Sequence, residues 1–480
     1  MRLLRLNAGR GTALESLLAP LGVEFPCGGN GICRGCRVRV AEGRVPVTPE
    51  MEELLSPEEL AAGWRLACCA RAEGPLLLEV AQWETAVLSD ETPFAFTPRE
   101  GRGIAVDLGT TTLAAQLIDL RTAEILGVET ALNPQARYGS DVMSRVQFAL
   151  GDTAQTPLIR QAVGKLVRRL AGDGVHRVIV VGNTVMQALF CGRDVEPLSH
   201  VPFECADLGE ARYGPGELGG DFPAGVEVRF LESIGGFVGS DILAGIHACG
   251  MVETDELTAL VDLGTNGEIV LGNRHKMLCA STAAGPAFEA GRIRMGMRAA
   301  PGAVAHVAAM NGRLQCRVLG EEPPRGVCGS GLIEAAAAGL QTGRILPNGR
   351  LAGGARELPL IAPVALTQGD IRELQLAKAA IAAGLRILLD HWGARREEIR
   401  RVHLAGAFGN YVSIEAARGV GLLEMDAGRI QAAGNTALRG AKMALFGDLP
   451  PVPVRHVGLA CDPRFQDVFA DCLAFPQPAT

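Results

Sequence analysis

Two apolar runs, each followed by the same polar turn, organise most of this chain. Residues 104–106 are apolar and lead into Asp-Leu-Gly-Thr at 107–110, after which residues 113–120 predict a second strand. About 155 residues later, residues 259–261 lead into Asp-Leu-Gly-Thr at 262–265, followed by a strand at 268–271. A repeated strand, turn and strand predicts an internal duplication, with two similar α/β halves.

Helical periodicity fills the chain around these strands. Residues 335–340 and 377–389 are apolar at helical spacing, and so is a stretch before the second repeat. The apolar face of that stretch consists of Leu158, Ile159, Val163, Leu166, Val167 and Leu170. A polar, proline-containing stretch at residues 85–102 predicts a semi-extended linker. We therefore expect a small domain at 1–84, a first half at 103–257, and a second half at 258–480 with a C-terminal return.

Composition limits what these domains do. The 480 residues are 48% hydrophobic and 21% charged, which is typical of folded domains with buried cores. The net charge of −7 argues against a general nucleic-acid or anionic-membrane binder, because both need a basic surface. The N-terminus lacks a signal-peptide pattern, and no window approaches the roughly 18 apolar residues of a membrane span. We expect a cytoplasmic protein, in which clustered cysteines bind metal or act in catalysis more often than they form disulfides.

Five of the 13 cysteines lie close together near the N-terminus. Cys27, Cys33 and Cys36 have the spacing C-x5-C-x2-C, and Cys68 and Cys69 follow later. Plant-type [2Fe–2S] ferredoxins have a similar loop and a distant fourth cysteine. The glycines of the loop allow the backbone to wrap closely around a cluster. A structural zinc site is the alternative, but such sites usually pair two C-x2-C knuckles, and the sequence offers no second one. The sequence Arg-Leu-Ala-Cys at 65–68 is similar to the ferredoxin ending and favours Cys68, with Cys69 left as the alternative fourth ligand.

The two Asp-Leu-Gly-Thr turns resemble the phosphate-binding hairpins of the actin, sugar-kinase and Hsp70 ATPase superfamily. In such a turn, glycine lets the backbone approach phosphate oxygens, and hydroxyl or amide side chains donate hydrogen bonds. Asp107 and Asp262 end the two strands and can hold Mg²⁺ through water. The candidate phosphate-binding residues are Gly109, Thr110, Thr111, Gly264, Thr265 and Asn266. The sequence contains no G-x-x-x-x-G-K-[ST] motif, so a P-loop is excluded.

Further glycine-rich segments follow the order of that superfamily. Residues 403–410, with Gly406 and Gly409, are similar to its adenosine-contacting turn. Residues 434–441 resemble the hinge helix between its halves, and residues 178–186 resemble the first-half counterpart of that helix. The order of phosphate turn, hinge, phosphate turn, adenosine turn and hinge carries more weight than any single glycine cluster.

Three more segments are distinctive: residues 133–145, residues 283–289 around Gly285, and residues 329–332. Tight loops and helix caps would account for each of them. We include Gly285 among the candidate nucleotide-binding residues.

A [2Fe–2S] domain joined to such an ATPase is an uncommon pairing. Together with the segments at 133–145, 262–269, 283–289 and 404–410, it resembles the ATP-dependent reductive activators of corrinoid proteins. The resemblance covers nearly the whole chain. It implies an α+β, β-grasp ferredoxin domain followed by a two-lobed α/β ATPase of the ribonuclease H-like type.

The resemblance also implies an activity and its participants. In that family, one electron passes from the [2Fe–2S] cluster to Co(II) on a partner corrinoid protein, which regenerates Co(I) for methyl transfer at the expense of ATP. It implies the cofactors ATP and Mg²⁺, an upstream low-potential electron donor and a possible homodimer. By matching motif, Cys27, Cys33, Cys36 and Cys68 would hold the cluster, Asp107 and Asp262 would act with Mg²⁺, and Gly406 and Gly409 would face the adenosine. The longer relatives carry a sizeable domain between the ferredoxin domain and the ATPase, and the gap of about 18 residues here predicts that it is missing. Either its function is dispensed with, or parts of the region after Leu120 supply it.

Three other functions are open on sequence grounds. A small-molecule kinase of the same superfamily with an attached redox domain would need a catalytic carboxylate, for which Asp262 or Glu268 could serve. An ATP-driven activator of another metalloenzyme, such as a radical-type dehydratase, would place a cluster on cysteines of the ATPase, but Cys279 and Cys328 lack clustered spacing. An actin-like filament would have no use for a redox cluster.

Overall fold

The computed structural model describes residues 2–18, 23, 36–80, 90–139, 141–172, 174–218, 222–264, 266–320, 322–406 and 412–477. Four residues of the predicted sites, Cys27, Cys33, Thr265 and Gly409, lie outside these ranges. Among the described residues, no helix combines the length and the apolar character needed to cross a bilayer.

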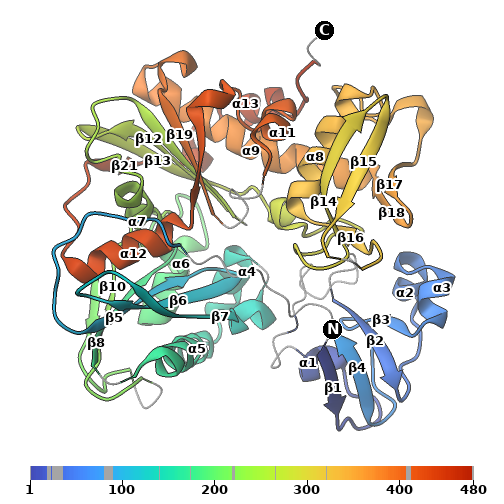
Figure 1. Cartoon of the computed structure of the whole chain (residues 1–480), viewed down its shortest axis with the longest axis horizontal. Coiled ribbons are helices and arrows are strands. Elements are labelled where there is room, and N and C mark those ends of the chain that lie inside the picture. The colour runs from blue at the N-terminus through green and yellow to red at the C-terminus, as the bar shows by residue number, and fades with distance from the viewer. Residues whose placement is uncertain are drawn as a thin grey trace.

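The N-terminal domain is a four-stranded antiparallel sheet with three short helices (Figure 1). Its elements are β1 (Arg2–Leu6), α1 (Leu14–Leu18), β2 (Arg37–Glu42), α2 (Pro49–Leu54), α3 (Pro57–Ala61), β3 (Trp64–Leu66) and β4 (Leu76–Val80). The strand order is β1-β4-β2-β3. Alternate residues of β4 are buried against α1, since the side chains of a strand point to opposite faces in turn. This small core holds Cys36 and Ala67, next to which the predicted ligand Cys68 lies.

The first half of the body contains a six-stranded mixed sheet. Its elements are β5 (Arg102–Leu108), β6 (Thr112–Asp119), β7 (Ile125–Leu132), η2 (Pro134–Tyr138), α4 (Val142–Ala149), α5 (Gln155–Leu170), β8 (Val175–Val181), α6 (Thr184–Cys191), η3 (Glu196–Leu198), β9 (Ala211–Tyr213), β10 (Glu227–Phe230) and α7 (Ser240–Ala248). The strand order is β7-β6-β5-β8-β10-β9, with β5 and β8 parallel. Helix α5 covers one face through Ile159, Val163, Leu166 and Val167, as its predicted apolar stripe requires.

The second half repeats this plan with a second six-stranded sheet. Its elements are β11 (Thr258–Leu263), β12 (Gly267–Asn273), β13 (Lys276–Thr282), η4 (Pro286–Glu289), β14 (Ala303–Met310), β15 (Arg313–Val318), β16 (Gly326–Val327), α8 (Gly329–Gln341), η5 (Ala352–Gly354), β17 (Glu357–Ile361), β18 (Val364–Thr367), α9 (Gln368–Trp392), η6 (Arg396–Glu398), β19 (Arg401–Ala405), α11 (Ile414–Gly419), η7 (Ala427–Arg429), β20 (Ile430–Gly434), α12 (Thr436–Phe446), β21 (Val454–His456), η8 (Leu459–Cys461) and α13 (Phe465–Asp471). The strand order is β20-β19-β11-β12-β13-β21. Strands β5–β6 and β11–β12 are the matched hairpins that the sequence repeat predicts.

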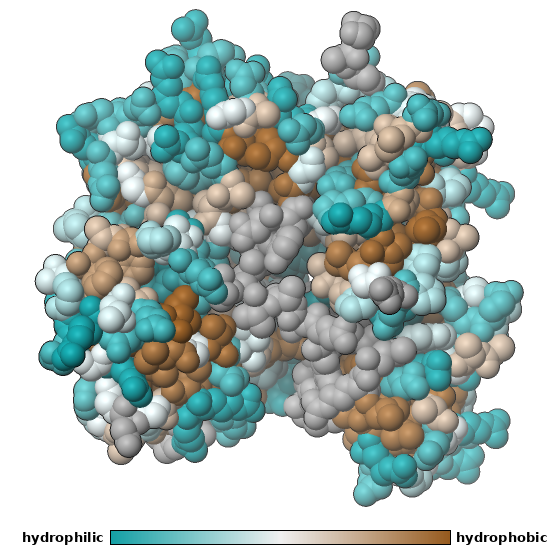
Figure 2. Space-filling view, in the orientation of Figure 1, coloured by the Kyte–Doolittle hydropathy of each residue, from teal (hydrophilic) through white to brown (hydrophobic). Residues whose placement is uncertain are grey.

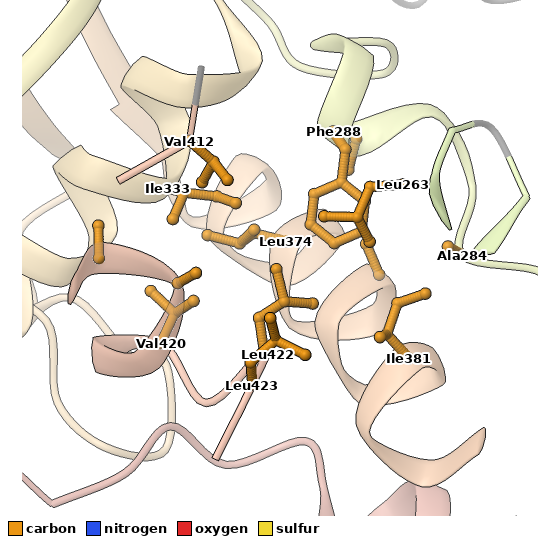
Figure 3. Packing of buried hydrophobic residues seen from close by; sticks show 14 of the residues in the cluster. Leu263, Ala284, Phe288, Ile333, Leu374, Ile381, Val412, Val420, Leu422 and Leu423 are labelled. Carbon is orange, nitrogen blue, oxygen red and sulfur yellow. The ribbon is translucent and has the colours of Figure 1, made fainter. Parts of the chain in front are cut away.

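The largest apolar core belongs to this second half. Figure 3 shows Leu263, the residue after Asp262, together with Phe288 of η4 and with Leu374 and Ile381 of the long helix α9. These side chains belong to one buried cluster, so packing fixes the end of β11 and with it the position of the second predicted phosphate turn. On the face shown in Figure 2, several brown patches lie among hydrophilic side chains.

Helices α7 and α12 cross where the two halves meet. Gly440 of α12 lies so close to α7 that an added Cβ would be 2.2 Å from the carbonyl oxygen of Ala244. Ala437 and Ala441 of α12 are buried in one cluster with Ala244. The prediction of a hinge helix at 434–441 is confirmed in position by α12, but the predicted partner at 178–186 is wrong, because those residues form β8 and the start of α6. The partner of α12 is α7.

The described part of the predicted linker is held against the body. Its described residues, from Asp90 onward, form no helix or strand before β5. Phe94 and Phe96 nevertheless pack on Phe446 at the end of α12, with ring centroids 5.6 and 4.7 Å from that of Phe446. This part of the connection is held on the surface of the hinge helix.

We predict that Gly440→Ala destabilises the protein by about 1–3 kcal/mol, because the new methyl group meets the Ala244 carbonyl oxygen in the backbone of α7. Helix propensity alone would predict the opposite sign, since alanine favours a helix interior over glycine by about 1 kcal/mol. Denaturant unfolding of the full chain measures the difference.

Gly369→Ala in the first turn of α9 is the matched control. The Cβ at that position would meet only the Thr367 hydroxyl, at 3.5 Å. We expect this variant to unfold at the wild-type denaturant concentration or above. Equal stability of Gly440→Ala and the wild type would contradict the close crossing of α7 and α12.

Candidate functional site

Four acidic side chains from both halves converge where the halves meet. Asp107 lies near the end of β5, Asp262 near the end of β11, Glu268 on β12 and Asp241 in the first turn of α7. Asp262 and Glu268 are direct partners in the β11–β12 register. Glu268 is buried and the three aspartates are half-buried.

The surrounding protein and their mutual repulsion make these acids weak. Loss of water raises the pKa of Asp107 to about 6, although a hydrogen bond from Asn435 Nδ2 to Asp107 Oδ2, at 2.9 Å, opposes the rise. Loss of water and the negative charge of Asp107 raise the pKa of Asp262 to about 7. The same two causes, with Asp262 as the repelling neighbour, raise the pKa of Asp241 to about 8. Burial, together with Asp241, holds the pKa of Glu268 well above its usual range.

Such a group of acids favours a nearby cation. Charged carboxylates removed from water are costly unless positive charge compensates them. Within the described ranges, no three side chains of His, Cys, Asp or Glu are placed to bind one metal ion directly. The acids therefore fit an ion that keeps its own water ligands, which Mg²⁺ prefers to do.

The first predicted phosphate turn is a tight connection between β5 and β6. Leu108 pairs with Leu113, which leaves residues 109–112 as the turn, and the Gly109 N–H donates to the carbonyl of Thr112 at 3.2 Å. A Cβ at Gly109 would lie 2.6 Å from that carbonyl oxygen, so the turn requires glycine there. The hydroxyl of Thr110 accepts a hydrogen bond from Asn183 Nδ2 at 3.0 Å.

The distinctive segment at 133–145 supports this turn. The Asn133 N–H donates to the Thr111 carbonyl at 2.9 Å, and its side-chain Nδ2 donates to the Gly109 carbonyl, also at 2.9 Å. Asn133 caps η2 as well, and Asp141 caps α4 by accepting the backbone N–H of Ser144. The cap interpretation of this segment is confirmed, and the segment also holds the backbone of the phosphate turn.

The second predicted turn lies against the C-terminal glycine motif. The Gly264 N–H donates to the Asn266 carbonyl at 3.1 Å. Gly406 has a φ of +88°, and a Cβ there would lie 2.6 Å from Asp262 Oδ1. The structure thus brings Gly406 directly against Asp262, whereas contact of Gly406 and Gly409 with adenosine stays a prediction.

Gly285 lies close to a contact between the two halves. It precedes η4 with a φ of +75°, and a Cβ there would meet nothing within 4 Å. Four residues later, Glu289 Oε2 accepts a hydrogen bond from the Thr111 hydroxyl at 3.3 Å. Residues 283–289 therefore reach the first phosphate turn from the second half.

Asp241 is the residue that the sequence interpretation missed. An acid in the first turn of an apolar helix, here Ser-Asp-Ile-Leu-Ala-Gly-Ile after a strand, was the available signal. Because the partner of the hinge helix was predicted at residues 178–186, no role was predicted for the helix that begins at Ser240. Once α7 is identified as the partner of α12, Asp241 stands at its start beside Asp262.

The described cysteines of the N-terminal domain agree with the predicted cluster site. The Sγ atoms of Cys36 and Cys68 are 3.3 Å apart, and Cys68 and Cys69 Sγ are 3.4 Å apart. Two thiolates on one tetrahedral metal, each at about 2.3 Å, are about 3.7 Å apart. Cys36 and Cys68 therefore fit as ligands of one iron. Cys69 is adjacent, and its exclusion as a ligand stays a prediction.

Three family models match separate parts of the chain. The "2Fe-2S iron-sulfur cluster binding domain" family matches residues 5–73. The "RACo middle region" family matches residues 102–254, and "C-terminal domain of RACo the ASKHA domain" matches residues 256–480. The "RACo middle region" match falls on the segment predicted as the first half of the body. The absence of a further domain between the ferredoxin domain and the ATPase stays a prediction.

Curated relatives match about three quarters of the chain. The chain is 31% identical over 416 residues to "Corrinoid activation enzyme RamQ" of Eubacterium limosum, an alignment that covers 76% of this chain and 69% of that protein. It is 28% identical over 381 residues to "[Co(II) methylated amine-specific corrinoid protein] reductase" of Methanosarcina barkeri, covering 71% and 69%. A solved structure titled "Reductive activator for corrinoid,iron-sulfur protein" has a TM-score of 0.70 and 26% identity, with 98% of this chain and 96% of that chain covered.

We predict that the stability of the nucleotide-free protein falls as the pH rises, and that Asp241→Asn reduces this fall. The folded state raises the pKa of Asp241 from 3.8 to about 8, so it binds more protons than the unfolded state between these values. Stability is therefore lost on going up through this range. Thermal unfolding at a series of pH values, without Mg²⁺ or nucleotide, measures the slope of Tm.

Asp467→Asn serves as the control, since Asp467 also lies in the first turn of a helix, α13, but is exposed. It should keep the wild-type slope. A slope that Asp241→Asn leaves unchanged would show that Asp241 ionises normally in the folded protein.

Proposed function

The chain belongs to the family of reductive activators of corrinoid proteins, and from this membership we propose that it returns an inactivated corrinoid protein to its Co(I) state in an ATP-dependent reaction. One electron would leave a [2Fe–2S] cluster in the N-terminal domain and reduce Co(II) on the partner. The Co(I) product is the nucleophile for methyl transfer. An upstream low-potential donor would then supply the next electron.

The observation that carries this proposal is the union of two sites in one chain. A paired Cys36 and Cys68 lie in a ferredoxin domain, and acids from both halves of an ATPase-type body meet at its centre. A kinase needs no cluster, and a simple ferredoxin needs no nucleotide. The combination suits a reduction that nucleotide binding or hydrolysis makes possible.

The cluster, when bound, supplies a one-electron donor. On this chain, Cys27, Cys33, Cys36 and Cys68 would hold it. The core around Cys36 and Ala67 limits access of water to one side of the site, and burial of this kind is one of the factors that set a cluster's potential.

In the ATPase body, the two turns would hold the phosphates. Gly109 and Gly264 let the backbone approach, and backbone N–H groups with the side chains of Thr110, Thr111, Thr265 and Asn266 would donate hydrogen bonds. Asp107 and Asp262 would hold Mg²⁺ through its water ligands. Asp241 and Glu268 would then lose protons as the ion arrives, because positive charge lowers the pKa of neighbouring acids. Gly406, which lies beside Asp262, and Gly409 would contact the adenosine.

We predict that Cys36→Ser abolishes cobalt reduction while leaving ATP binding intact, because the cysteine and the acids lie in different domains. The purified protein is mixed with candidate Co(II) corrinoid proteins, a low-potential reductant and Mg-ATP, and Co(I) is followed by its absorbance. Reduction by the wild type that requires both ATP and the cluster supports the proposal. A colourless, folded wild-type protein from anaerobic, iron-replete expression would contradict the proposed function.

Cys68→Ser and Cys69→Ser provide the matched pair. Because Cys68 touches both neighbouring thiols, its loss should remove the [2Fe–2S] EPR signal of the reduced protein, and loss of Cys69 should not. The reverse result would make Cys69 the fourth ligand.

A further inference from the structure

Residues 90–96, here called the tether anchor, connect the ferredoxin domain to the body along the hinge helix α12. The anchor begins at Asp90 beside the first turns of α12, and it ends at Phe94 and Phe96 beside Phe446, the last residue of α12. Both ends of this helix thus hold a segment that lies about 350 residues earlier in the chain.

Asp90 is the most strongly held residue of the anchor. Its side chain is 3% exposed, and its carboxylate accepts hydrogen bonds from Arg439 Nη2 at 2.8 Å, Arg439 Nε at 3.2 Å and Lys442 Nζ at 3.3 Å. Lys442, whose side chain is 2% exposed, also donates to the Asp90 carbonyl. A buried carboxylate between two cations is costly to separate, since either partner alone would leave an uncompensated charge.

Arg439 also contacts both halves of the body. Its Nη2 donates to the Ala433 carbonyl at 2.7 Å, on β20 of the second sheet, and its Nη1 donates to the Ala248 carbonyl at 3.4 Å, at the end of α7. One guanidinium therefore joins the anchor, the partner hinge helix and the second sheet. A rotation of one half against the other must change at least one of these contacts.

The start of α12 reaches the acids. Asn435, which caps α12, donates to Asp107 Oδ2 at 2.9 Å, and Arg439 lies one helical turn further along. In a helix, four residues span about 6 Å. Asp107 and the anchor thus form hydrogen bonds with neighbouring turns of the same helix, α12.

We propose that Asp90 is a positioning residue that couples the nucleotide state of the ATPase body to the ferredoxin domain through Arg439 and α12. The effect on electron transfer rests on the proposed function, whereas the coupling between nucleotide and the anchor does not. When nucleotide moves the two halves, α12 and Arg439 move the anchor, and the anchor sets the point from which the ferredoxin domain starts its movement.

The short remaining connection makes this point matter. Ten residue steps separate Val80, the end of β4, from Asp90, so the connection spans at most about 35 Å. The Thr92 hydroxyl also accepts a hydrogen bond from Arg439 Nη2, at 2.8 Å. Loss of the Arg439 contacts to both Asp90 and Thr92 would leave Phe94 as the next described residue held on α12 and add at most about 14 Å. In its present position, the ferredoxin domain contacts the body where Arg37, next to Cys36, donates to the Arg325 carbonyl at 3.3 Å.

The test compares Asp90→Asn with Glu91→Gln in the full-length protein. Glu91 is the exposed neighbouring acid, so its variant controls for loss of charge in the same segment. Hydrogen exchange of the peptide covering the anchor is measured with and without a non-hydrolysable Mg-ATP analogue. We expect nucleotide to change exchange in the wild type and in Glu91→Gln, whereas Asp90→Asn should exchange at least about tenfold faster and should not respond.

Cobalt reduction provides the second readout. Loss of a typical coupling free energy corresponds to at least about a fivefold fall in the stimulation of Co(I) formation by ATP. ATP hydrolysis and the EPR signal of the cluster should stay at wild-type levels, which a general folding defect would not allow. If Asp90→Asn is insoluble, the double variant Asp90→Asn, Lys442→Met takes its place, because it removes the buried charges of both Asp90 and Lys442.

The outcomes separate the two proposals. A wild-type exchange response to nucleotide in Asp90→Asn, or equal defects in Asp90→Asn and Glu91→Gln, overturns the coupling through Asp90. If nucleotide changes anchor exchange in the wild type but no corrinoid protein is reduced, the coupling stands and the proposed function fails.

Discussion

The removal of four acids from water at the meeting of two sheets is the constraint on which the rest of this structure depends. Asp107, Asp241, Asp262 and Glu268 come from both halves, and each has a raised pKa because the protein encloses it. For Asp241, Asp262 and Glu268, repulsion by neighbouring acids raises the pKa further. No packing interaction explains such an arrangement, since buried carboxylates oppose folding unless they are protonated or compensated. Such a site suits the cation and phosphate binding that we propose for it, in which the two glycine turns would supply the donors that phosphate needs.

The same acids make the hinge helices mechanically important. Asp241 begins α7, and Asn435, which begins α12, donates to Asp107. The two helices then cross at contact distance through Gly440 and Ala244, so small side chains are required where they meet. A change in the charge of these acids therefore alters the forces on the first turns of two packed helices. Packed helices shift as units, because interiors packed at high density do not deform continuously.

Local patterns in the sequence predicted the elements well, and long-range contacts were predicted less well. The hairpins at Asp107 and Asp262 and the helix carrying Ile159 and Val163 follow from periodicity along the chain. The proximity of Cys36 to Cys68 was implied by the resemblance to ferredoxins. The partner of α12 could not be found in this way, because alanine and glycine occur on several helices and only the fold decides which of them cross. Asp241 was missed for the same reason. The ion pairs of Asp90 could not be predicted, because arginine and lysine side chains such as those of Arg439 and Lys442 are usually exposed to solvent. These two side chains become buried only through contact with a segment about 350 residues away in the chain.

These features also explain how nucleotide could do work in the proposed reaction. A ligand shifts a conformational equilibrium only by its difference in affinity for the two states. In the proposed site, a magnesium–nucleotide complex held by Asp107 from one half and by Asp262 from the other would have such a difference, because it would need both halves close together. Part of that binding free energy is then available at α12, which touches Asp107 through Asn435 and the connection to the ferredoxin domain through Arg439. The connection between Val80 and Asp90 spans at most about 35 Å. A displacement of the anchor is therefore a substantial fraction of the distance that the ferredoxin domain can move.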